Sequence, residues 1–218
     1  RCQGTSQTKG LPCIGLLQQL KHLNVSRSGD YAYNKITDVG LVSIAALSQL
    51  QSLELRYCNQ VTDAGLVNIA ALSQLQFLNL SGCDQITSIH DISSLQQLRG
   101  LALNDCKIMD AGIASIGSLH QLQRLTLRCT RITDAGIVIV ASLKQLQVLD
   151  VDGCTSITDA TLVIVALMPQ LQLLGLDCNQ FDFDHFDFRR LVLVQNQQVQ
   201  LWHGDWNCYN VSHVPDDF

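Results

Sequence analysis

Two groups of side chains near the end of this 218-residue chain could do chemistry. Carboxylates beside a histidine can bind divalent metal ions, and the first group consists of Asp182, Asp184, His185 and Asp187. A histidine and a carboxylate near a thiol can activate a nucleophile, and the second group consists of His203, Asp205 and Cys208. Neither spacing matches an established metal loop or catalytic triad. We therefore predict no catalytic residue, metal or cofactor, and keep a small-ligand or metal site in this segment as an alternative.

The elements that must position such groups follow from one pattern, L-x-x-L-x-L, repeated along the chain. Its first copy is LKHLNV from Leu20 and its last is LQLLGL from Leu171. The second leucine of each copy recurs every 23 to 30 residues, at Leu23, Leu53, Leu78, Leu101, Leu125, Leu149 and Leu174. Self-similarity with a period of this length indicates a repeat architecture in which each unit packs on the next.

One unit shows what each repeat should form. In LQSLEL, Leu53 and Leu55 alternate with polar residues, which predicts a short, half-buried strand. The stretch VTDAGLVNIAALSQ follows, with Thr62 or Asp63 as a helix cap and apolar residues at near-helical spacing. The unit ITSIHDISSLQQL from Ile86 lacks this helix start and should be extended or a single turn. Stacking such units predicts a parallel sheet on a concave side and helices on a convex side.

The motif LxLxxCxxITDAGL, seen in LELRYCNQVTDAGL from Leu53 and LDVDGCTSITDATL from Leu149, can be compared with known repeats. It resembles the cysteine-containing subtype of leucine-rich repeat, found in the substrate-recognition arms of F-box ubiquitin-ligase adaptors and in bacterial and protozoan proteins. The resemblance covers roughly residues 15–180 and implies an α/β leucine-rich repeat solenoid, a horseshoe with a C-terminal cap. No stretch before Leu20 is long enough for an F-box.

We expect one structural domain with three parts. Residues 1–19 form an N-terminal cap, and residues 20–180 form about seven leucine-rich repeats. Residues 181–218 are aromatic-rich and partly alternating, which suits a C-terminal capping segment that covers the last exposed core face.

Four of the nine cysteines occupy one register position, five residues after the central leucine of a repeat. They are Cys58, Cys83, Cys106 and Cys154. The resemblance implies that they point into the solenoid and hydrogen-bond the neighbouring backbone, as a structural ladder. One cysteine per repeat does not give the tetrahedral spacing of a zinc site.

The cysteines also indicate the cellular compartment in which the protein is found. A row of four buried thiols favours a reducing one, so a cytoplasmic location is expected. The alternative is a secreted or cell-surface recognition protein, with a Cys2–Cys13 disulfide and N-glycans at some of the sequons Asn24, Asn79 and Asn210.

Side chains that alternate with the core leucines should line the concave face. Strands of a parallel sheet lie about 4.8 Å apart, so Arg124 and Arg128 could pair with aspartates on the next strand. The candidate partner-binding residues of this face are Arg56, Phe77, Arg124, Arg128, Asp150 and Asp152. Tyr31 and Tyr33, in the insertion SRSGDYAYNKITD, either contact a partner as a loop or pack over the N-terminal end.

Net charge and hydropathy limit the kinds of partner that the chain can bind. A net charge of −5 argues against nucleic acid, which needs clustered Lys and Arg. No apolar run reaches the roughly 18 to 20 residues that would span a bilayer. We predict a non-catalytic protein–protein interaction module that binds a protein or peptide mainly through its concave face, as an intracellular adaptor or effector. The oligomeric state stays open.

Overall fold

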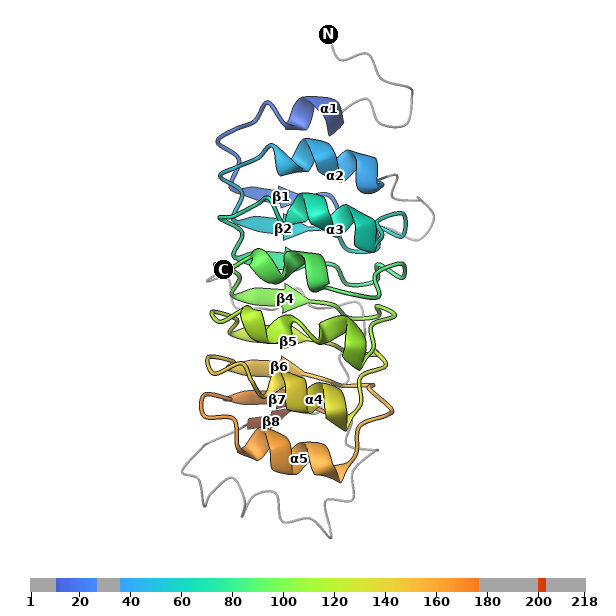
Figure 1. Cartoon of the computed structure of the whole chain (residues 1–218), viewed down its shortest axis with the longest axis vertical. Coiled ribbons are helices and arrows are strands. Elements are labelled where there is room, and N and C mark those ends of the chain that lie inside the picture. Colours follow the sequence, from blue (N-terminus) through green and yellow to red (C-terminus); the bar gives the residue numbers. More distant parts are fainter. Residues whose placement is uncertain (1–10, 27–35, 177–199, 203–218) are drawn as a thin grey trace.

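A computed structural model describes residues 11–26, 36–176 and 200–202 as a stack of repeats (Figure 1). Eight described strands form one parallel sheet in chain order. They are β1 (His22–Asn24), β2 (Ser52–Glu54), β3 (Phe77–Asn79), β4 (Gly100–Ala102), β5 (Arg124–Thr126), β6 (Val148–Asp150), β7 (Leu173–Gly175) and β8 (Gln200–Trp202). Central leucines face each other across the pairs, as Leu23 faces Leu53 and Leu53 faces Leu78. The predicted α/β leucine-rich repeat solenoid is confirmed.

Helices cover the opposite side of the sheet. The α-helices are α1 (Leu11–Ile14), α2 (Asp38–Ala45), α3 (Asp63–Ile69), α4 (Asp134–Val140) and α5 (Asp159–Ala166). The 3-10 helices are η1 (His90–Ser94), η2 (Asp110–Ile113) and η3 (Ile116–Ser118). We call this side the helix face. The side chains that alternate with the buried strand leucines form the sheet face, which is the face predicted to be concave.

The middle of the helix face is built differently from its ends. The third unit forms the short η1, as its missing helix start predicts. The fourth unit has the start DAGI yet forms η2 and η3. Gly112 lies so close to the backbone oxygen of Thr87 that a Cβ there would overlap it, and its own oxygen accepts a 2.9 Å hydrogen bond from Ile89 N. This close packing on the shorter third unit accompanies the tighter helical turns of the fourth.

A continuous core runs between the two faces. The strand leucines Leu53, Leu55, Leu78 and Leu80 are at most 2% exposed, and each repeat adds an equivalent set. The buried positions extend without interruption from Ile36 to Leu176 in the described part of the chain. Each layer is therefore completed by its neighbours, as expected for a solenoid.

Hydrogen bonds between Asp and Thr link successive helix starts. Thr62 caps α3, because its Oγ1 accepts from Ala64 N at 3.3 Å. Asp38, the first residue of α2, accepts from Thr62 N at 2.9 Å and from Thr62 Oγ1 at 2.8 Å. We call this pair of bonds a rung, and it recurs between Asp63 and Thr87, Asp110 and Thr133, and Asp134 and Thr158. Ser88 and Met109 occupy the Asp and Thr positions between the third and fourth units, where neither can form the rung.

In the five repeats where this position is described, the residue four positions after the central leucine has a positive φ. These residues are Tyr57 (57°), Gly82 (73°), Asp105 (56°), Cys129 (53°) and Gly153 (71°). The Tyr57 ring occupies the space that a Cβ would need at Gly82. In the same way, a Cβ at Gly153 would lie 2.8 Å from Cys129 Sγ. At these two junctions, a side chain in one repeat is followed by glycine in the next. The positive φ at this position also suits glycine best.

Candidate functional site

In the middle of the sheet face, an aromatic ring and an arginine flank the small residues of β4. Gly100 faces Phe77 on one side and Arg124 on the other, at the same register of β3, β4 and β5. A Cβ at position 100 would lie 2.8 Å from Phe77 Cδ1, so the ring leans over the glycine. Ala102 continues the small surface along β4. Phe77 and Arg124 are half-buried, and partial burial lowers the Arg124 pKa.

Two hydroxyl groups lie on this face without a hydrogen-bond partner among the described residues. They are Thr126 Oγ1 on β5 and Ser81 Oγ just after β3. Ser81 is 4% exposed, and its backbone N–H donates to Asn79 Oδ1 at 3.0 Å. Buried hydroxyls usually have a partner, and these two oxygens are themselves buried. The sequence did not single them out, although their alternation with core leucines placed them on this face.

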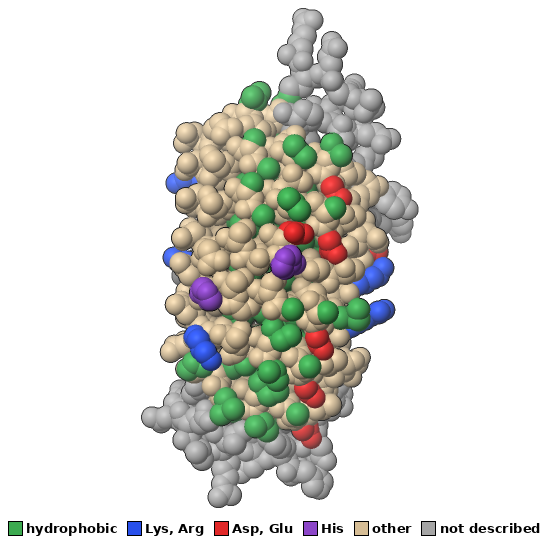
Figure 2. All heavy atoms as spheres, viewed as in Figure 1, with side chains coloured by type: hydrophobic (Ala, Val, Ile, Leu, Met, Phe, Trp, Pro, Cys, Tyr) green, Lys and Arg blue, Asp and Glu red, His purple; other side chains and the backbone are tan. Residues whose placement is uncertain are grey.

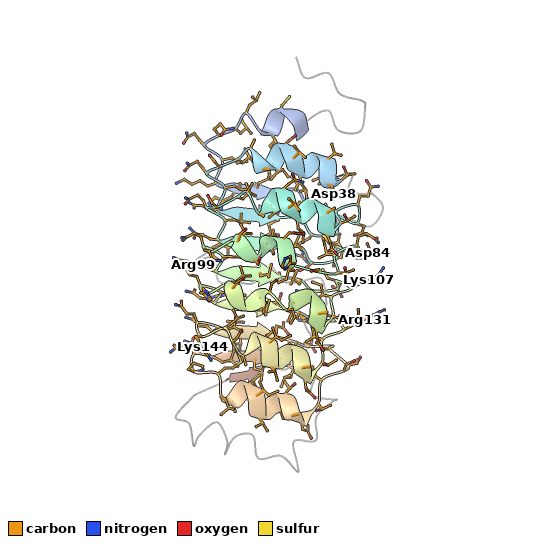
Figure 3. All side chains as sticks on the ribbon, in the orientation of Figure 1. Asp38, Asp84, Arg99, Lys107, Arg131 and Lys144 are labelled. Carbon is orange, nitrogen blue, oxygen red and sulfur yellow. The ribbon has the colours of Figure 1, made fainter. Side chains whose placement is uncertain are left out.

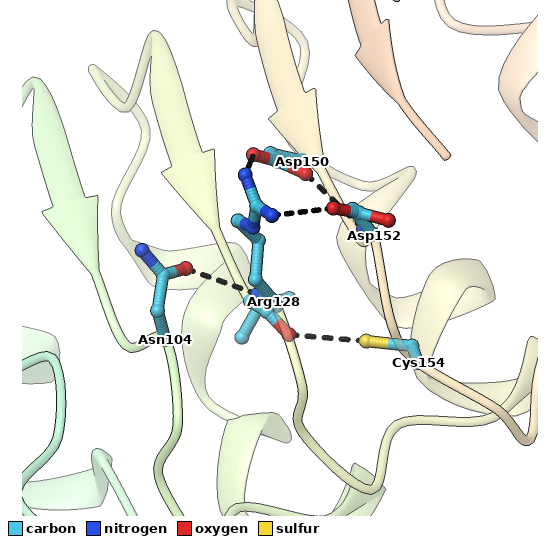
Figure 4. A network of polar contacts seen from close by, with 6 residues as sticks. Asn104, Arg128, Asp150, Asp152 and Cys154 are labelled. Atoms are coloured by element: carbon cyan, nitrogen blue, oxygen red, sulfur yellow. Dashed lines mark hydrogen bonds and ion pairs between the residues drawn. The ribbon is translucent and has the colours of Figure 1, made fainter. Parts of the chain in front are cut away.

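Arg128 belongs to a buried network at the ends of β5 and β6 (Figure 4). Its guanidinium pairs with Asp152 at 2.5 Å and with Asp150 at 3.8 Å, and its backbone N–H donates to Asn104 Oδ1 at 3.0 Å. Arg128 is 9% exposed. Burial raises the Asp150 pKa, while the hydrogen bond from Asp152 N and the charge of Arg128 lower it, and the net shift is upward. The predicted pairing across adjacent strands is present for Arg128, in a position where little of its side chain can meet a partner.

The remaining candidates of the sheet face lie nearer the N-terminal end. Arg56 is half-buried at the end of β2, and its guanidinium carbon lies 5.9 Å from the centroid of the Tyr57 ring. Its backbone N–H donates to Ser26 Oγ at 3.1 Å. Tyr31 and Tyr33 lie outside the described residues.

The four cysteines of the predicted ladder are buried thiols in four different repeats. Their Sγ atoms lie within hydrogen-bond reach of a carbonyl oxygen in the preceding repeat: Leu55 for Cys83 at 3.1 Å, Leu80 for Cys106 at 3.3 Å, Leu127 for Cys154 at 3.0 Å and Val25 for Cys58 at 3.9 Å. Burial raises the pKa of Cys83 to about 12 and also raises those of Cys106 and Cys154. The thiols of Cys83, Cys106 and Cys154 therefore stay protonated at neutral pH, and hydrogen-bond strand-end carbonyls instead of acting as nucleophiles.

Other candidate sites have few described residues. Cys13 is disulfide-bonded, and its partner lies outside the described residues. The candidate metal and catalytic groups of residues 182–187 and 203–208 also lie outside them. Within the described ranges, no three His, Cys, Asp or Glu side chains gather closely enough to hold a metal ion. No helix in those ranges is both long and apolar enough to cross a membrane.

Comparisons with known proteins agree with this architecture. A family model described as leucine-rich repeat matches residues 32–45 and 47–70. A comparison with curated proteins gave no match. Internalin C2 from Listeria monocytogenes is similar in structure, with a TM-score of 0.61 and 24% identity over 91% of this chain and 84% of its own.

Two further solved structures are similar at comparable levels. A leucine-rich repeat protein from Leptospira interrogans has a TM-score of 0.60 and 23% identity, over 88% of this chain and 45% of its own. A chain of the yeast Rad7 and Elc1 complex has a TM-score of 0.60 and 19% identity, over 77% of this chain and 44% of its own. This chain thus spans less than half the length of either. At these identities the likeness concerns the fold.

Proposed function

We propose that this leucine-rich repeat protein is a non-catalytic interaction module that binds a protein or peptide across its sheet face. The observation that carries the proposal is the placement of Phe77 and Arg124 on either side of β4, in the middle of the sheet. Aromatic and arginine side chains in the middle of a surface are the residues that most often dominate binding energy. Gly100 lies buried beneath the Phe77 ring, and Ala102 is the partly exposed small residue of β4 beside which a partner can approach the sheet.

Neighbouring polar groups support a peptide-like partner. Thr126 Oγ1 and Ser81 Oγ lie on the same face and have hydrogen-bonding capacity that the described residues leave unused. Both oxygens are buried, so the N–H and C=O groups of a peptide can satisfy them only where neighbouring side chains shift. Within this proposal the ends of β5 and β6 are held in place by Arg128, Asp150 and Asp152. The contacts to the partner come from Phe77 and Arg124. More specifically, we propose that the module serves as an adaptor or effector. The solved structure of the similar yeast chain contains a protein complex.

A display experiment tests the proposal. Peptides would be selected on the immobilised protein from a random-peptide library and then measured against Phe77→Ala, Arg124→Ala and the control His22→Ala. His22 occupies the same register on β1, at the far end of the sheet. We expect at least about a tenfold loss of affinity for each of the first two variants and little change for the control. Peptides that bind all three variants like the wild type would exclude the β4 area as the site.

We further propose a secreted or cell-surface location, the alternative that the cysteines left open. Free buried thiols favour a reducing compartment, yet the raised pKa of Cys83 keeps its reactive thiolate scarce in any compartment. The ladder is therefore compatible with both locations. The disulfide at Cys13 supports the oxidising one.

Thiol counting on protein isolated from its source cell tests the location. The denatured protein would be titrated with a thiol reagent before and after reduction. We expect at least two additional thiols after reduction. If all nine cysteines react without reduction, the cytoplasmic location holds instead.

A further inference from the structure

Exposed apolar side chains are concentrated away from the sheet face. Among the described residues, the large hydrophobic side chains that are most exposed lie on the helix face or near the N-terminal turn. They are Leu16, Leu17, Val39, Val42, Val67, Met109, Val138, Val163 and Leu167. Single exposed apolar residues are ordinary, but repeated ones on one face indicate an interaction surface.

Four of these valines share one position in their helices. Each lies four residues after the aspartate that begins the helix, as Val67 follows Asp63 and Val138 follows Asp134. The other two pairs are Asp38 with Val42 and Asp159 with Val163. Residues four apart are neighbours on a helix surface, so each valine lies beside an aspartate. Figure 2 shows this face, where apolar side chains lie beside a column of acidic ones.

The acidic column is not matched by basic residues on the same face. The described helices α2 to α5 and η1 to η3 contain no Lys or Arg. Figure 3 shows Arg99 and Lys144 at one edge of the stack and Lys107 and Arg131 at the other. The ion pairs in the described ranges join Lys107 to Asp84 and Arg128 to the β6 aspartates, so they leave the column uncompensated.

Rungs hold three of these four carboxylates in place, those of Asp38, Asp63 and Asp134. Asp134 accepts hydrogen bonds from Thr158 and from Thr161 Oγ1. Burial alone raises the Asp134 pKa, but these hydrogen bonds outweigh it and the pKa is lowered. The negative charge of Asp134 is thus fixed beside Val138 and persists at neutral pH.

We propose that the helix face is a second docking surface, for a basic amphipathic helix of another protein. Its apolar side would lie on Val42, Val67, Val138 and Val163, and its Lys or Arg side chains would meet the aspartate column. Charge complementarity selects this occupant. A second copy of this face would set aspartates against aspartates, and nucleic acid or an anionic membrane would also meet like charge. This surface is separate from the sheet face and independent of its partner.

A synthetic peptide probes this chemistry directly. We would use a labelled helix of about 18 residues, about 27 Å long, with leucines on one side and lysines on the other. The same peptide with glutamate for lysine is its control. Binding to the full chain would be measured by fluorescence anisotropy at low and high salt. We expect the lysine peptide to bind, with an affinity that falls as salt rises, and the glutamate peptide not to bind.

Matched variants then locate the site. Val67 and Val138 are 57% and 59% exposed, so Val67→Lys with Val138→Lys should leave the core intact. The control Gln74→Lys with Gln145→Lys adds the same charge at exposed positions off the helix face. We expect at least a tenfold loss of lysine-peptide affinity for the valine variant and less than a twofold loss for the control. Equal losses in both variants, or equal binding of the glutamate peptide, would overturn the proposal. So would wild-type dimers in sedimentation velocity that dissociate in the valine variant, because the occupant would then be a second copy.

Discussion

At the scale of single residues, the guanidinium of Arg128 lies between two carboxylates, with 9% of the residue exposed. In this position its charge is needed by the fold. Asp150 and Asp152 have little access to water, and burial alone raises the Asp150 pKa. Removing the arginine would leave both carboxylates without their cation, which is the costly way to break a buried ion pair.

We expect Arg128→Ala to lower the free energy of unfolding by about 3 kcal/mol, measured by urea denaturation. Adding Asp150→Asn and Asp152→Asn should recover part of the loss, because the unpaired charges are then gone. A loss of less than about 0.5 kcal/mol in Arg128→Ala would show that the network contributes no more than a surface pair.

The buried thiols predict how stability depends on alkaline pH. The pKa of Cys83 is raised from 9.0 to about 12, and that of Cys106 is also raised. Above pH 9 the unfolded chain therefore releases protons that the folded chain still holds. The thiols' contribution is full below about pH 9 and is lost as the pH rises towards 12, with a slope of about 1.4 kcal/mol per pH unit for each thiol.

Urea midpoints at a series of pH values from 8 to about 11 would measure this slope. The variant Cys83→Ala with Cys106→Ala should be less stable at pH 8 yet show a shallower decline. Parallel curves for the variant and the wild type would mean that other groups cause the alkaline loss.

At the scale of elements, the rung joins the start of one helix to the start of the next. The carboxylate of Asp134 accepts from the backbone and side chain of Thr158 and also from Thr161, which is buried. Asp159 begins α5 at the same helical position, and no rung from it lies within the described part of the chain. The two aspartates differ in their inter-repeat bonds while sharing the favourable effect of a negative charge at a helix start.

We expect Asp134→Ala to reduce stability by about 2 kcal/mol more than Asp159→Ala, since only the first leaves Thr158 and Thr161 without their acceptor. Thermal and urea denaturation of both variants would measure the difference. Equal losses would assign the whole effect to helix capping, and the rung would then contribute little.

The elements also show what the sequence could and could not predict. The strands followed from the alternation around Leu53 and its equivalents, because that pattern is local. The 3-10 helices of the fourth unit did not, since they accompany a close approach of Gly112 to Thr87 in another repeat. Arg124 and Arg128 looked alike from sequence. Their difference in burial depends on neighbouring strands, and only the assembled sheet brings those together.

At the scale of the whole molecule, stability is shared among interfaces between neighbouring repeats, and of the described interfaces from α2 to α5 one lacks a rung. Ser88 and Met109 stand where Asp and Thr occur elsewhere. The 3-10 helices of the described chain lie at this same place, between α3 and α4. In a stack whose units contact only their neighbours, this boundary is where cooperativity should be weakest.

Installing the missing pair tests this view. We expect Ser88→Asp with Met109→Thr to raise the free energy of unfolding by about 1 kcal/mol more than the sum of the single variants. A complete double-mutant cycle by urea denaturation gives that coupling. Additive effects would show that the local geometry, with η1 in place of an α-helix, keeps the two positions apart.

The pairing of Tyr57 with Gly82 and of Cys129 with Gly153 restricts how a chain of this kind can grow. If the Tyr57 repeat were copied alone, the copy would place a second tyrosine at the position that Gly82 now occupies. The Tyr57 ring leaves room there only for glycine. Copying the Tyr57 repeat together with the Gly82 repeat preserves the fit at that junction. Gene duplication, or an engineer who wishes to lengthen the array, must therefore transmit the Tyr57 repeat together with the Gly82 repeat as a two-unit cassette.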